Sequence, residues 1–368
     1  IEQPISARTF TAFSLLILLL LLVFFGQLIY LQVFEHDTLI ARAEENRLSH
    51  SSVSAERGLI LDRNGDVLAK NIPGETPTST AKRAYPLGEA ASIIVGYVSY
   101  PKQDQNGFWY QEETSGISGV ELLWNDELSG KNGIRIAETD ASGNTVSGSV
   151  VRNPEAGKDI PLTLDTGVQE ALYGAIRTRA TDAGWRGGTG AIIDIETGEV
   201  IALASYPSFD PELMSTGEPK EEVERLLNDP RSPFLDRAVS GLYTPGSVVK
   251  PFVATAALEE SVISANKQIL STGSISIPNP YDPEKPSIFK DWKAHGWVDM
   301  RHALAVSSDV YFYAVGGGYQ DQQGLGIAAI EKYMRLFGFA SPTGFAIPGE
   351  ETGTIPNPEW KAEKFDGE

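Results

Sequence analysis

The stretch Tyr243–Phe252, Y-T-P-G-S-V-V-K-P-F, places a lysine and a proline where a helix is expected to begin. Gly246 makes a sharp entry, and the run F-V-A-T-A-A-L predicts a small-residue, apolar helix in a core. Ser247 and Lys250 are three residues apart, so on a helical turn they share one face within hydrogen-bonding reach. The pair is therefore a candidate serine nucleophile with its base.

The alternative interpretation makes Ser247 a helix N-cap and lets Lys250 reach solvent. Two features count against it. A cation in the first turn interacts unfavourably with the helix dipole, at a cost of roughly 0.3–1 kcal/mol. Pro251 lacks an amide donor and disfavours a helical backbone at the residue before it. Local rules broken together on a buried helix favour a functional site. The positive helix end and burial would both favour the neutral amine of Lys250, which could then take the proton of Ser247.

The pattern Ser-x-x-Lys alone is a weak signal, because it begins at five positions: Ser79, Ser99, Ser247, Ser264 and Ser287. Three of the others lie in proline-containing, loop-like surroundings. Ser264 falls near the end of the apolar helix, where a lysine is ordinary.

A second candidate stretch is A-L-A-V-S-S-D-V-Y-F-Y, from Ala303 to Tyr313. Ser307 and Asp309 place polar groups where a core is expected; a simple turn or another N-cap is the alternative. In D-W-K-A-H-G-W, Trp292 and His295 could line a substrate groove, although a packed loop is the more ordinary interpretation.

The amino-acid composition excludes several classes of function. The 368 residues contain 49 acidic and 30 basic side chains, a formal charge of -19, which argues against a nucleic-acid surface. Cysteine is absent and there are four histidines, so thiol catalysis, disulfides and cysteine zinc sites are excluded. Neither G-x-S-x-G nor H-E-x-x-H occurs, and we expect no metal and no cofactor.

An uncharged, largely apolar run extends from Thr9 to Phe34, whereas roughly 20 apolar residues suffice to cross a bilayer. Its length favours an uncleaved anchor over a signal peptide. Arg8 precedes the run, and Glu35 and Asp37 follow it. This charge bias predicts a cytoplasmic tail at 1–8, a membrane anchor at 9–34 and an extracytoplasmic remainder.

Several segments after the anchor have clear local patterns. Glu56–Lys70 predicts a hairpin around Asn64-Gly65, and Asn71–Lys82 a linker or surface loop. Gly116–Gly133 predicts a helix between glycine-rich turns, followed by a strand.

The character of the chain changes near Asn153. Asp165 is expected to cap a helix, and Gly190–Ser205 predicts the central hairpin of a buried sheet.

These residues resemble the class B penicillin-binding proteins. P-G-S-V-V-K-P-F resembles the first catalytic motif of that family and S-S-D the second. E-R-G-L-I-L-D-R-N-G and G-I-S-G-V-E-L-L-W-N-D-E-L-S-G-K-N-G resemble its pedestal blocks, and L-D-R-A-V-S-G-L-Y-T-P-G-S the approach to the serine. Asp at position 309 and I-P-N-P-E-W-K are more similar to elongation-type than to division-type members.

The resemblance implies an α+β fold. A transpeptidase domain with an antiparallel sheet flanked by helices, at 153–368, would follow an elongated, β-rich dimerisation-type pedestal at 35–152 and one transmembrane helix. The implied partners are peptidoglycan stem peptides ending in D-alanyl-D-alanine, β-lactams, the membrane, a membrane-embedded glycosyltransferase and elongation-complex proteins.

The resemblance also implies a role for each candidate residue. Ser247 would attack the D-alanyl-D-alanine end of a stem peptide, with Lys250 as general base. Ser307 would relay a proton to the leaving amine, and Asp309 would orient Lys250 and the substrate amide. The backbone N–H of Ser247 would supply half of an oxyanion hole.

One departure from the family is the missing third motif: neither Lys-Thr-Gly nor Lys-Ser-Gly occurs up to Glu368. We therefore expect a sequence that is incomplete at its C-terminus, a fragment that could be inactive although its parent is an enzyme. A penicillin-sensing receptor or a β-lactamase would share the acyl-serine chemistry, and a non-catalytic scaffold of the wall-building complex is a further alternative.

Overall fold

The computed structural model describes residues 7–37, 48–74, 81–104, 109–111, 113–139, 145–279, 282 and 284–365. The chain divides into two compact units, which are described separately. The first comprises Ile1–Pro86, Val95–Thr163 and Met214–Gly217, and the second Leu87–Ile94, Leu164–Leu213 and Glu218–Glu368. The short helices α3 (Ser92–Val95) and α7 (Pro211–Thr216) contain residues of both units.

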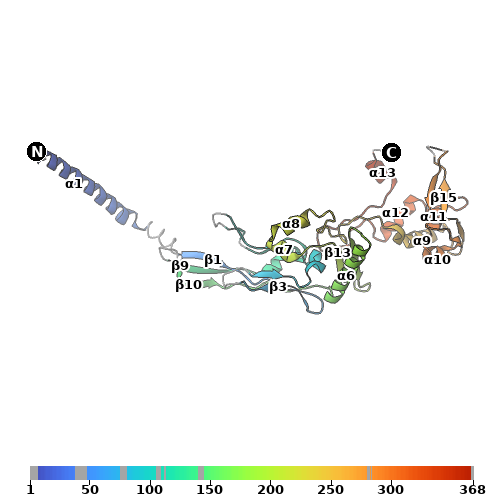
Figure 1. The fold of residues 1–368 in the computed structure, drawn as a ribbon, viewed down its shortest axis with the longest axis horizontal. Helices are drawn as coiled ribbons and strands as arrows, with labels where there is room; N and C mark the ends of the chain where they lie inside the picture. The colour runs from blue at the N-terminus through green and yellow to red at the C-terminus, as the bar shows by residue number, and fades with distance from the viewer. Residues whose placement is uncertain are drawn as a thin grey trace. The chain divides into compact units, whose positions relative to one another are not determined.

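The first unit begins with the apolar helix that the sequence predicts (Figure 1). It consists of α1 (Ala7–Ile29) and one wider π-helical turn, η1 (Tyr30–Phe34). Within the described residues, Phe10–Phe34 is the one helical stretch long and apolar enough to cross a membrane, and none of it is buried. Apolar side chains all around a helix are what a lipid environment accommodates.

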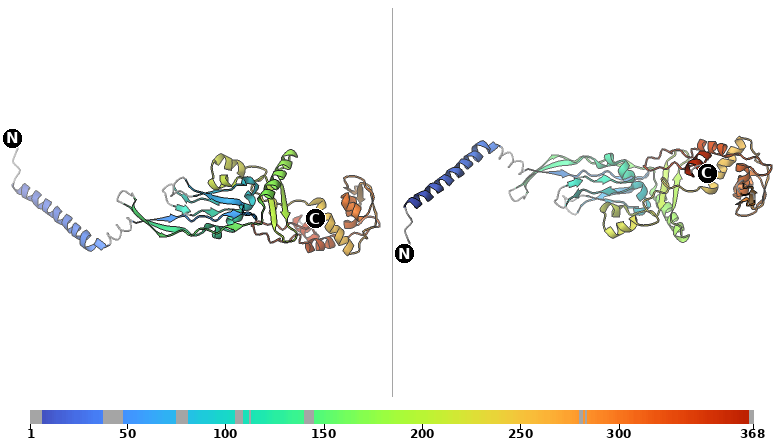
Figure 2. Two further views of the ribbon diagram at one scale, coloured as in Figure 1. Left: turned by 90° about the horizontal axis from the view of Figure 1, so that it is seen from below. Right: turned by 90° about the horizontal axis from the view of Figure 1, so that it is seen from above.

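Short antiparallel strands and two helical turns make up the rest of this unit. Its elements are β1 (Leu48–Val53), β2 (Ile60–Leu61), β3 (Val67–Ile72), β4 (Lys82–Ala84), β5 (Val98–Ser99), β6 (Lys102–Gln103), β7 (Trp109–Gln111), β8 (Ser115–Gly116), α4 (Gly119–Leu123), α5 (Asn125–Ser129), β9 (Gly133–Thr139), β10 (Thr145–Arg152) and β11 (Ile160–Pro161). One sheet has the order β1-β9-β10 and another the order β11-β2-β3-β4. Strands β1, β9 and β10 lie side by side (Figure 2).

The predicted hairpin around Asn64-Gly65 is confirmed, since β2 pairs with β3 in antiparallel register. Asp62 Oδ1 accepts hydrogen bonds from the backbone N–H groups of Asn64 (2.7 Å) and Asp66 (2.9 Å). Such local carboxylate bonds are typical of a tight turn. The positive φ of Gly65, 91°, is the backbone conformation that glycine allows without strain.

The predicted linker Asn71–Lys82 begins in β3 and ends in β4, and residues 75–80 lie outside the described part of the chain. The helix predicted between Gly116 and Gly133 is present as α4 and α5, which are interrupted at Trp124. The strand predicted after it is β9. The parallel pairing of β11 with β2 holds residues 160–161 in this unit.

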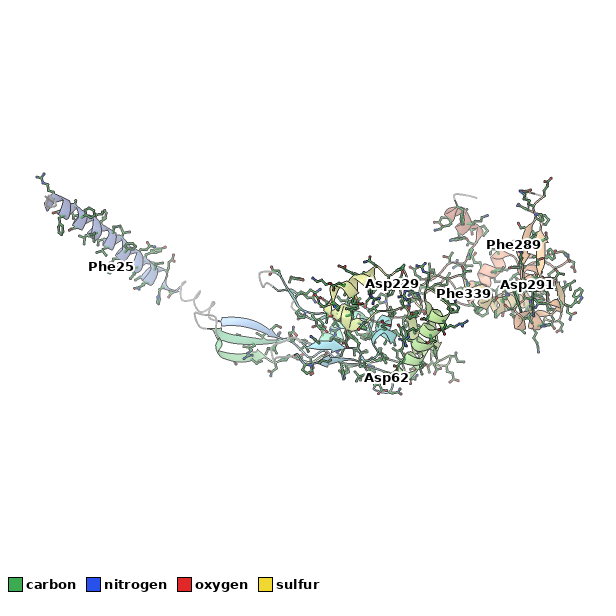
Figure 3. The ribbon with its side chains drawn as sticks, in the orientation of Figure 1. Phe25, Asp62, Asp229, Phe289, Asp291 and Phe339 are labelled. Carbon is green, nitrogen blue, oxygen red and sulfur yellow. The ribbon has the colours of Figure 1, made fainter. Side chains whose placement is uncertain are left out.

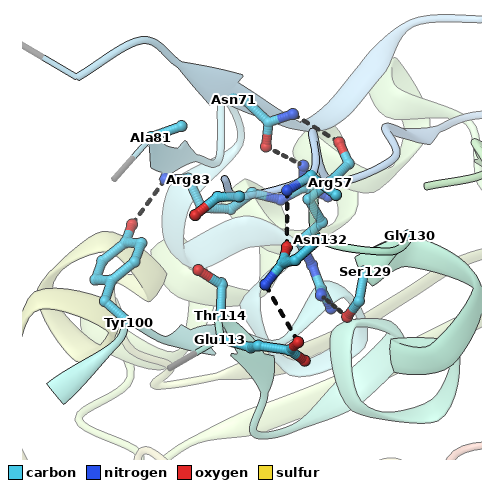
Figure 4. A pocket seen from close by; sticks show the side chains of 12 residues that line it. Arg57, Asn71, Ala81, Arg83, Tyr100, Glu113, Thr114, Ser129, Gly130 and Asn132 are labelled. Atoms are coloured by element: carbon cyan, nitrogen blue, oxygen red, sulfur yellow. Dashed lines mark hydrogen bonds between the residues drawn. The ribbon is translucent and has the colours of Figure 1, made fainter. Parts of the chain in front are cut away.

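A buried ion network joins these helices to the hairpin. Glu121 is fully buried and accepts hydrogen bonds of 2.7 Å from Nε of Arg57 and of 2.7 Å from Nε of Arg83. The remaining guanidinium donors reach backbone carbonyls and the side chains of Asn71, Asn125 and Ser129. Figure 4 shows both arginines at the wall of a cavity. Because their donors are satisfied inside the protein, the network reads as structure rather than as a ligand site.

The second unit is a mixture of helices and short strands. Its elements are η2 (Gly88–Ala90), α6 (Thr166–Asp182), β12 (Gly188–Ile193), β13 (Val200–Tyr206), α8 (Lys220–Leu227), η3 (Gly246–Val249), α9 (Lys250–Glu259), β14 (Ile269–Ser271), β15 (Ser274–Ile277), β16 (Ser287–Lys290), β17 (Gly296–Val298), α10 (Met300–Ala305), α11 (Asp309–Gly317), α12 (Ile327–Leu336) and α13 (Pro358–Lys364).

The expected hairpin at Gly190–Ser205 is present as β12 and β13, packed against α6. Asp165 caps α6 as predicted, accepting from the N–H of Val168 at 3.0 Å. Buried Gln169 exchanges two 2.8 Å hydrogen bonds with the backbone of Leu203, which fixes the helix to β13. The prediction of a buried hairpin is correct for the middle of β13 and wrong for β12, whose residues 191–193 are exposed.

A second apolar core lies among α9, α10 and α11. It contains small side chains of α9, such as Ala254 and Ala257, and larger ones of α11, such as Tyr311 and Val315. Small residues let the helices approach closely, so the apolar helix predicted after Lys250 is confirmed as a core helix. Phe252 packs edge-on against Phe337, with ring centroids 4.8 Å apart, and thereby joins α9 to the end of α12.

Candidate active site

Ser247 lies on η3, a single 3₁₀ turn that runs directly into α9. In a 3₁₀ turn, side chains at positions i and i+3 eclipse one another, so Ser247 and Lys250 share a face more closely than on an α-helix. Their backbones are also bonded, because the N–H of Lys250 donates to the carbonyl of Ser247. Ser247 caps neither helix with its side chain, which rules against the N-cap interpretation.

Pro251 does not conflict with this helix. It stands in the first turn of α9, where the missing N–H has no intrahelical partner to lose. Lys250 keeps helical backbone angles, with φ -58° and ψ -40°. The expectation that this proline disturbs the helix is therefore wrong; the helix begins one turn later than Ser247.

The second motif forms the turn between α10 and α11. Ser307 has φ 53°, in the left-handed region that non-glycine residues seldom occupy. Ser308 caps α11 by accepting from the N–H of Tyr311 at 3.4 Å. Asp309 is the first residue of α11, where a carboxylate suits the helix dipole. The N-cap of the alternative interpretation is thus present at Ser308, while Ser307 and Asp309 on either side of it bond residues of the first motif.

A continuous chain of hydrogen bonds joins the two motifs. Ser307 Oγ donates to Ser247 Oγ at 2.9 Å. Lys250 Nζ donates to Ser307 Oγ (3.0 Å), to the Ser307 carbonyl (2.8 Å) and to Asp309 Oδ1 (2.5 Å). The structure therefore brings together all four residues that the sequence singled out, and Ser307 stands between the serine and the lysine.

The side chains of this chain of hydrogen bonds differ in their exposure to solvent. Ser247 is exposed, whereas Lys250 is 8% exposed. The Asp309 side chain is 33% exposed, and the ring of Phe312 lies 5.8 Å from Nζ. An exposed hydroxyl next to a buried, hydrogen-bonded amine is suited to nucleophilic attack on a substrate that approaches from solvent.

Trp292 and His295 lie in the loop before β17 and pack edge-on, with centroids 5.1 Å apart. Trp292 is 63% exposed, and its Nε1 donates to the carbonyl of Val306 at 3.2 Å, one residue before Ser307. The His295 side chain is only 2% exposed and lies 3.4 Å from Asp291. Their proposed substrate contacts stay a prediction.

Sequence reasoning did not assign a role to Asp291 (Figure 3). Its buried carboxylate accepts from Ser308 Oγ at 2.9 Å and from the N–H of Val310 at 3.0 Å. Burial raises the pKa of this carboxyl. Hydrogen bonds from Val310, Ser308 and Trp292 together outweigh that effect, so the pKa is lowered overall. An acid followed by aromatic and basic residues carries no local signal for such a role, because its partners lie far along the chain.

Within the described residues, no group of three or more histidine, aspartate or glutamate side chains is arranged to hold a metal ion. The candidate site itself offers two hydroxyl groups, an amine and a carboxylate. A serine hydroxyl connected to a lysine through a second serine is suited to forming and breaking an acyl ester.

The fold and the two motifs are similar to those of the penicillin-binding proteins, and two family models match the chain. Residues 188–367 match the penicillin binding protein transpeptidase domain, and residues 71–162 match the penicillin-binding protein dimerisation domain. The chain belongs to the penicillin-binding proteins of class B architecture, in which a dimerisation domain precedes the transpeptidase domain. The implied α+β fold is confirmed.

Individual relatives narrow the comparison. The chain is 30% identical to the peptidoglycan D,D-transpeptidase MrdA of Acinetobacter baumannii, over 94% of this chain and 60% of that protein. It is similar to Pseudomonas aeruginosa PBP2 in complex with WCK 5153, with 32% identity, a TM-score of 0.63, and coverage of 85% of this chain and 61% of that one.

A third similarity is to a chain from a peptidoglycan synthase complex, described for its coordination of polymerization and crosslinking. The identity is 27% and the TM-score 0.68, with coverage of 98% of this chain and 72% of that chain. The 368 residues span about three fifths of the length of the MrdA relative from A. baumannii.

Proposed function

We propose that this protein is a membrane-anchored peptidoglycan D,D-transpeptidase of the elongation type, with Ser247 as its nucleophile. The observation that carries the proposal is the hydrogen-bond chain from Ser247 Oγ through Ser307 Oγ to Lys250 Nζ. Similarity to proteins named peptidoglycan D,D-transpeptidase MrdA supports the substrate class. The elongation type is supported by those names together with Asp at position 309.

In the proposed first half-reaction, Ser247 Oγ attacks the carbonyl carbon of the penultimate D-alanine. Lys250 accepts the hydroxyl proton, through Ser307 Oγ in the geometry observed here. The three acceptors around Nζ fit the ammonium form, which is the form of Lys250 after that transfer. The C–N bond then breaks, the proton passes through Ser307 to the departing amine, and terminal D-alanine leaves.

In the second half-reaction, the amine of a neighbouring stem peptide attacks the acyl ester on Ser247. The new amide bond forms as the ester C–O bond breaks, and the proton lost by the amine returns to the Ser247 hydroxyl along the same chain. Asp309 orients Lys250 throughout, because it holds Nζ at 2.5 Å. Trp292, which is 63% exposed, would line the approach of the substrate, and the buried side chain of His295 would support its ring. β-Lactams would acylate the same serine.

The apolar helix supports a single-pass anchor at residues 9–34. The charge bias of its flanks supports an orientation with residues 1–8 in the cytoplasm and the rest outside it. In that division, residues 35–152 form the pedestal and 153–368 the catalytic domain. The similarity to a chain from a peptidoglycan synthase complex supports a membrane-embedded glycosyltransferase as partner, within an elongation complex.

The experiment that tests this function is labelling with a fluorescent penicillin, using protein expressed from its complete reading frame in membranes. We expect stable label that is lost in Ser247→Ala. Ser264→Ala is the matched control, because Ser264 begins another Ser-x-x-Lys and is also exposed; it should label like the wild type.

The alternatives predict other outcomes. Label that turns over rapidly would indicate a β-lactamase. Stable label without crosslinked products from stem-peptide substrates would indicate a penicillin-sensing receptor. A complete lack of label would sink every enzymatic reading and favour a non-catalytic scaffold of the wall-synthesis complex.

A further inference from the structure

We propose that Asp291 is a positioning residue that, together with Trp292, clamps the turn carrying Ser307 and Asp309. The inference rests on the proposed acylation of Ser247. It concerns Asp291 and Trp292, neither of which forms a hydrogen bond with Ser247 or Lys250 in the described part of the chain.

The clamp holds alternate residues of the turn. Trp292 Nε1 donates to the carbonyl of Val306 at 3.2 Å. Asp291 Oδ2 accepts from Ser308 Oγ at 2.9 Å and from the N–H of Val310 at 3.0 Å. Residues 306, 308 and 310 are thus bonded to Asp291 and Trp292, whereas the side chains of Ser307 and Asp309 are bonded to Ser247 and Lys250.

This turn needs support from outside itself. Ser307 occupies a left-handed conformation, with φ 53°, which persists when surrounding structure determines it. Ser308 is fully buried, and its hydroxyl is held by Asp291 while it caps α11. A small shift of the turn would lengthen the bond between Ser307 and Ser247, and a misplacement of about 1 Å can cost a catalyst about 100-fold in rate.

A purely structural role for Asp291 makes a different prediction. Loss of fold lowers the fraction of molecules that can be acylated, whereas loss of positioning slows every molecule without lowering that fraction. The acylation rate constant, the noncovalent affinity for penicillin and the final labelling stoichiometry therefore separate the two roles.

Asp291→Asn is the conservative variant. Its amide oxygen can replace Oδ2 as acceptor for Ser308 and Val310. Its NH₂ group then takes the place of Oδ1, where His295 Nε2, which has no hydrogen-bond partner among the described residues, lies 3.4 Å away. The bond that Oδ1 accepts from the exposed N–H of Trp292 at 2.8 Å is lost, and water can replace that acceptor. Asp291→Ala removes the acceptor altogether. Asp165→Ala is the matched control, because Asp165 caps α6 rather than α11.

The test is the kinetics of fluorescent penicillin acylation in the protein expressed from its complete reading frame. We expect Asp291→Ala to reach wild-type stoichiometry with an acylation rate constant lower by about 10–100-fold, with little change in affinity. Asp291→Asn and Asp165→Ala should stay within a few-fold of wild type. Trp292→Phe, which keeps an aromatic ring and loses the donor to Val306, should be slower in the same rate constant and serves where Asp291→Ala fails to fold.

The inference is overturned if folded Asp291→Ala or Trp292→Phe acylates at the wild-type rate, or if Trp292→Phe changes only the affinity. It is also overturned if Asp165→Ala slows acylation as much as Asp291→Ala does. If wild-type protein is not labelled at all, the proposed function is wrong. If wild-type protein is labelled normally and the variants acylate at the same rate, only the inference about Asp291 and Trp292 is wrong.

Discussion

The hydroxyl of Ser307 donates a 2.9 Å hydrogen bond to the hydroxyl of Ser247, and the same oxygen accepts from Lys250 at 3.0 Å. Ser307 is thus the shared neighbour of the proposed nucleophile and its base. Its backbone is strained, since φ is 53°. Strain at a residue that connects two functional groups indicates that its position matters more than its local stability.

Replacement of Ser307 separates the effect of its bridging hydroxyl from the effect of its strained backbone. Ser307→Ala removes the bridging hydroxyl and keeps the strained backbone, whereas Ser307→Gly removes the hydroxyl and relieves a strain of about 1–2 kcal/mol. Both variants should be acylated by penicillin about 100-fold more slowly than wild type. The glycine variant should nevertheless unfold at a higher temperature than the alanine variant. Wild-type acylation in either variant would remove Ser307 from the proton path.

Lys250 offers a test of the base itself. Lys250→Arg keeps the positive charge beside Asp309 but supplies a guanidinium that does not give up its proton in proteins. Acylation should therefore fall by about 1,000-fold or more, even though the charge is retained. Lys267→Arg, in another Ser-x-x-Lys, is the matched control and should acylate normally. Near-normal acylation of Lys250→Arg would show that charge alone is required.

The sequence is informative about the proposed catalytic residues because their spacing is local. Ser247 and Lys250 share one turn, and Ser307 and Asp309 share another, so each pair can be recognised without knowledge of the fold. The contact between the two turns was expected from the resemblance to penicillin-binding proteins. Physical reasoning alone gave only two unusual polar stretches next to apolar helices.

The sequence does not predict contacts between residues that lie far apart along the chain. Asp291 bonds Ser308 and Val310, which lie 17 and 19 residues further along the chain. Asp291 itself lies in a loop, where no periodic pattern of residues predicts such contacts. The strand β12 is apolar, and an apolar run indicates burial without saying which segment covers it; residues 191–193 are exposed in this structure. Pro251 misled for another reason, because a proline disturbs a helix only beyond its first turn.

The buried ion network of the first unit should be highly sensitive to loss of its carboxylate. Glu121→Ala leaves the charges of Arg57 and Arg83 buried without a counter-ion, at a cost of about 3–5 kcal/mol. Glu155→Ala breaks the exposed pair with Lys131, whose side chains are 76% and 68% exposed, and should cost less than about 1 kcal/mol. Thermal unfolding measures both, and equal effects would show that burial does not govern the network.

Asp236 should limit the stability of the second unit at neutral pH. Burial raises the pKa of this carboxyl, and bonds from the N–H groups of Ala238 (2.9 Å) and Val239 (3.2 Å) only partly offset it. Its Oδ2 is buried without a hydrogen-bond partner among the described residues. Asp236→Asn keeps one acceptor oxygen and removes the buried charge. The variant should therefore be more stable than wild type at pH 7.

The pH dependence of that difference has a defined sign. Below the unfolded-state pKa, about 3.9, the Asp236 carboxyl is protonated in both states and the two proteins should be equally stable. As the pH rises through the elevated folded-state pKa, wild type loses stability and Asp236→Asn does not. Thermal unfolding from pH 3 to pH 8 should show a gap that opens with rising pH; a constant gap would contradict the assignment to charge burial.

Asp229 provides the opposite case in the same unit. Hydrogen bonds from the side chain and backbone of Arg231 lower the pKa of Asp229 to about 2. Its stabilisation is complete above the unfolded-state value near 3.9 and is lost as the pH falls towards about 2. Asp229→Asn should therefore be less stable than wild type at pH 7, with a deficit that closes in acid. Because both variants remove one negative charge, a general effect of net charge would move them in the same direction, whereas local burial and pairing move them in opposite directions.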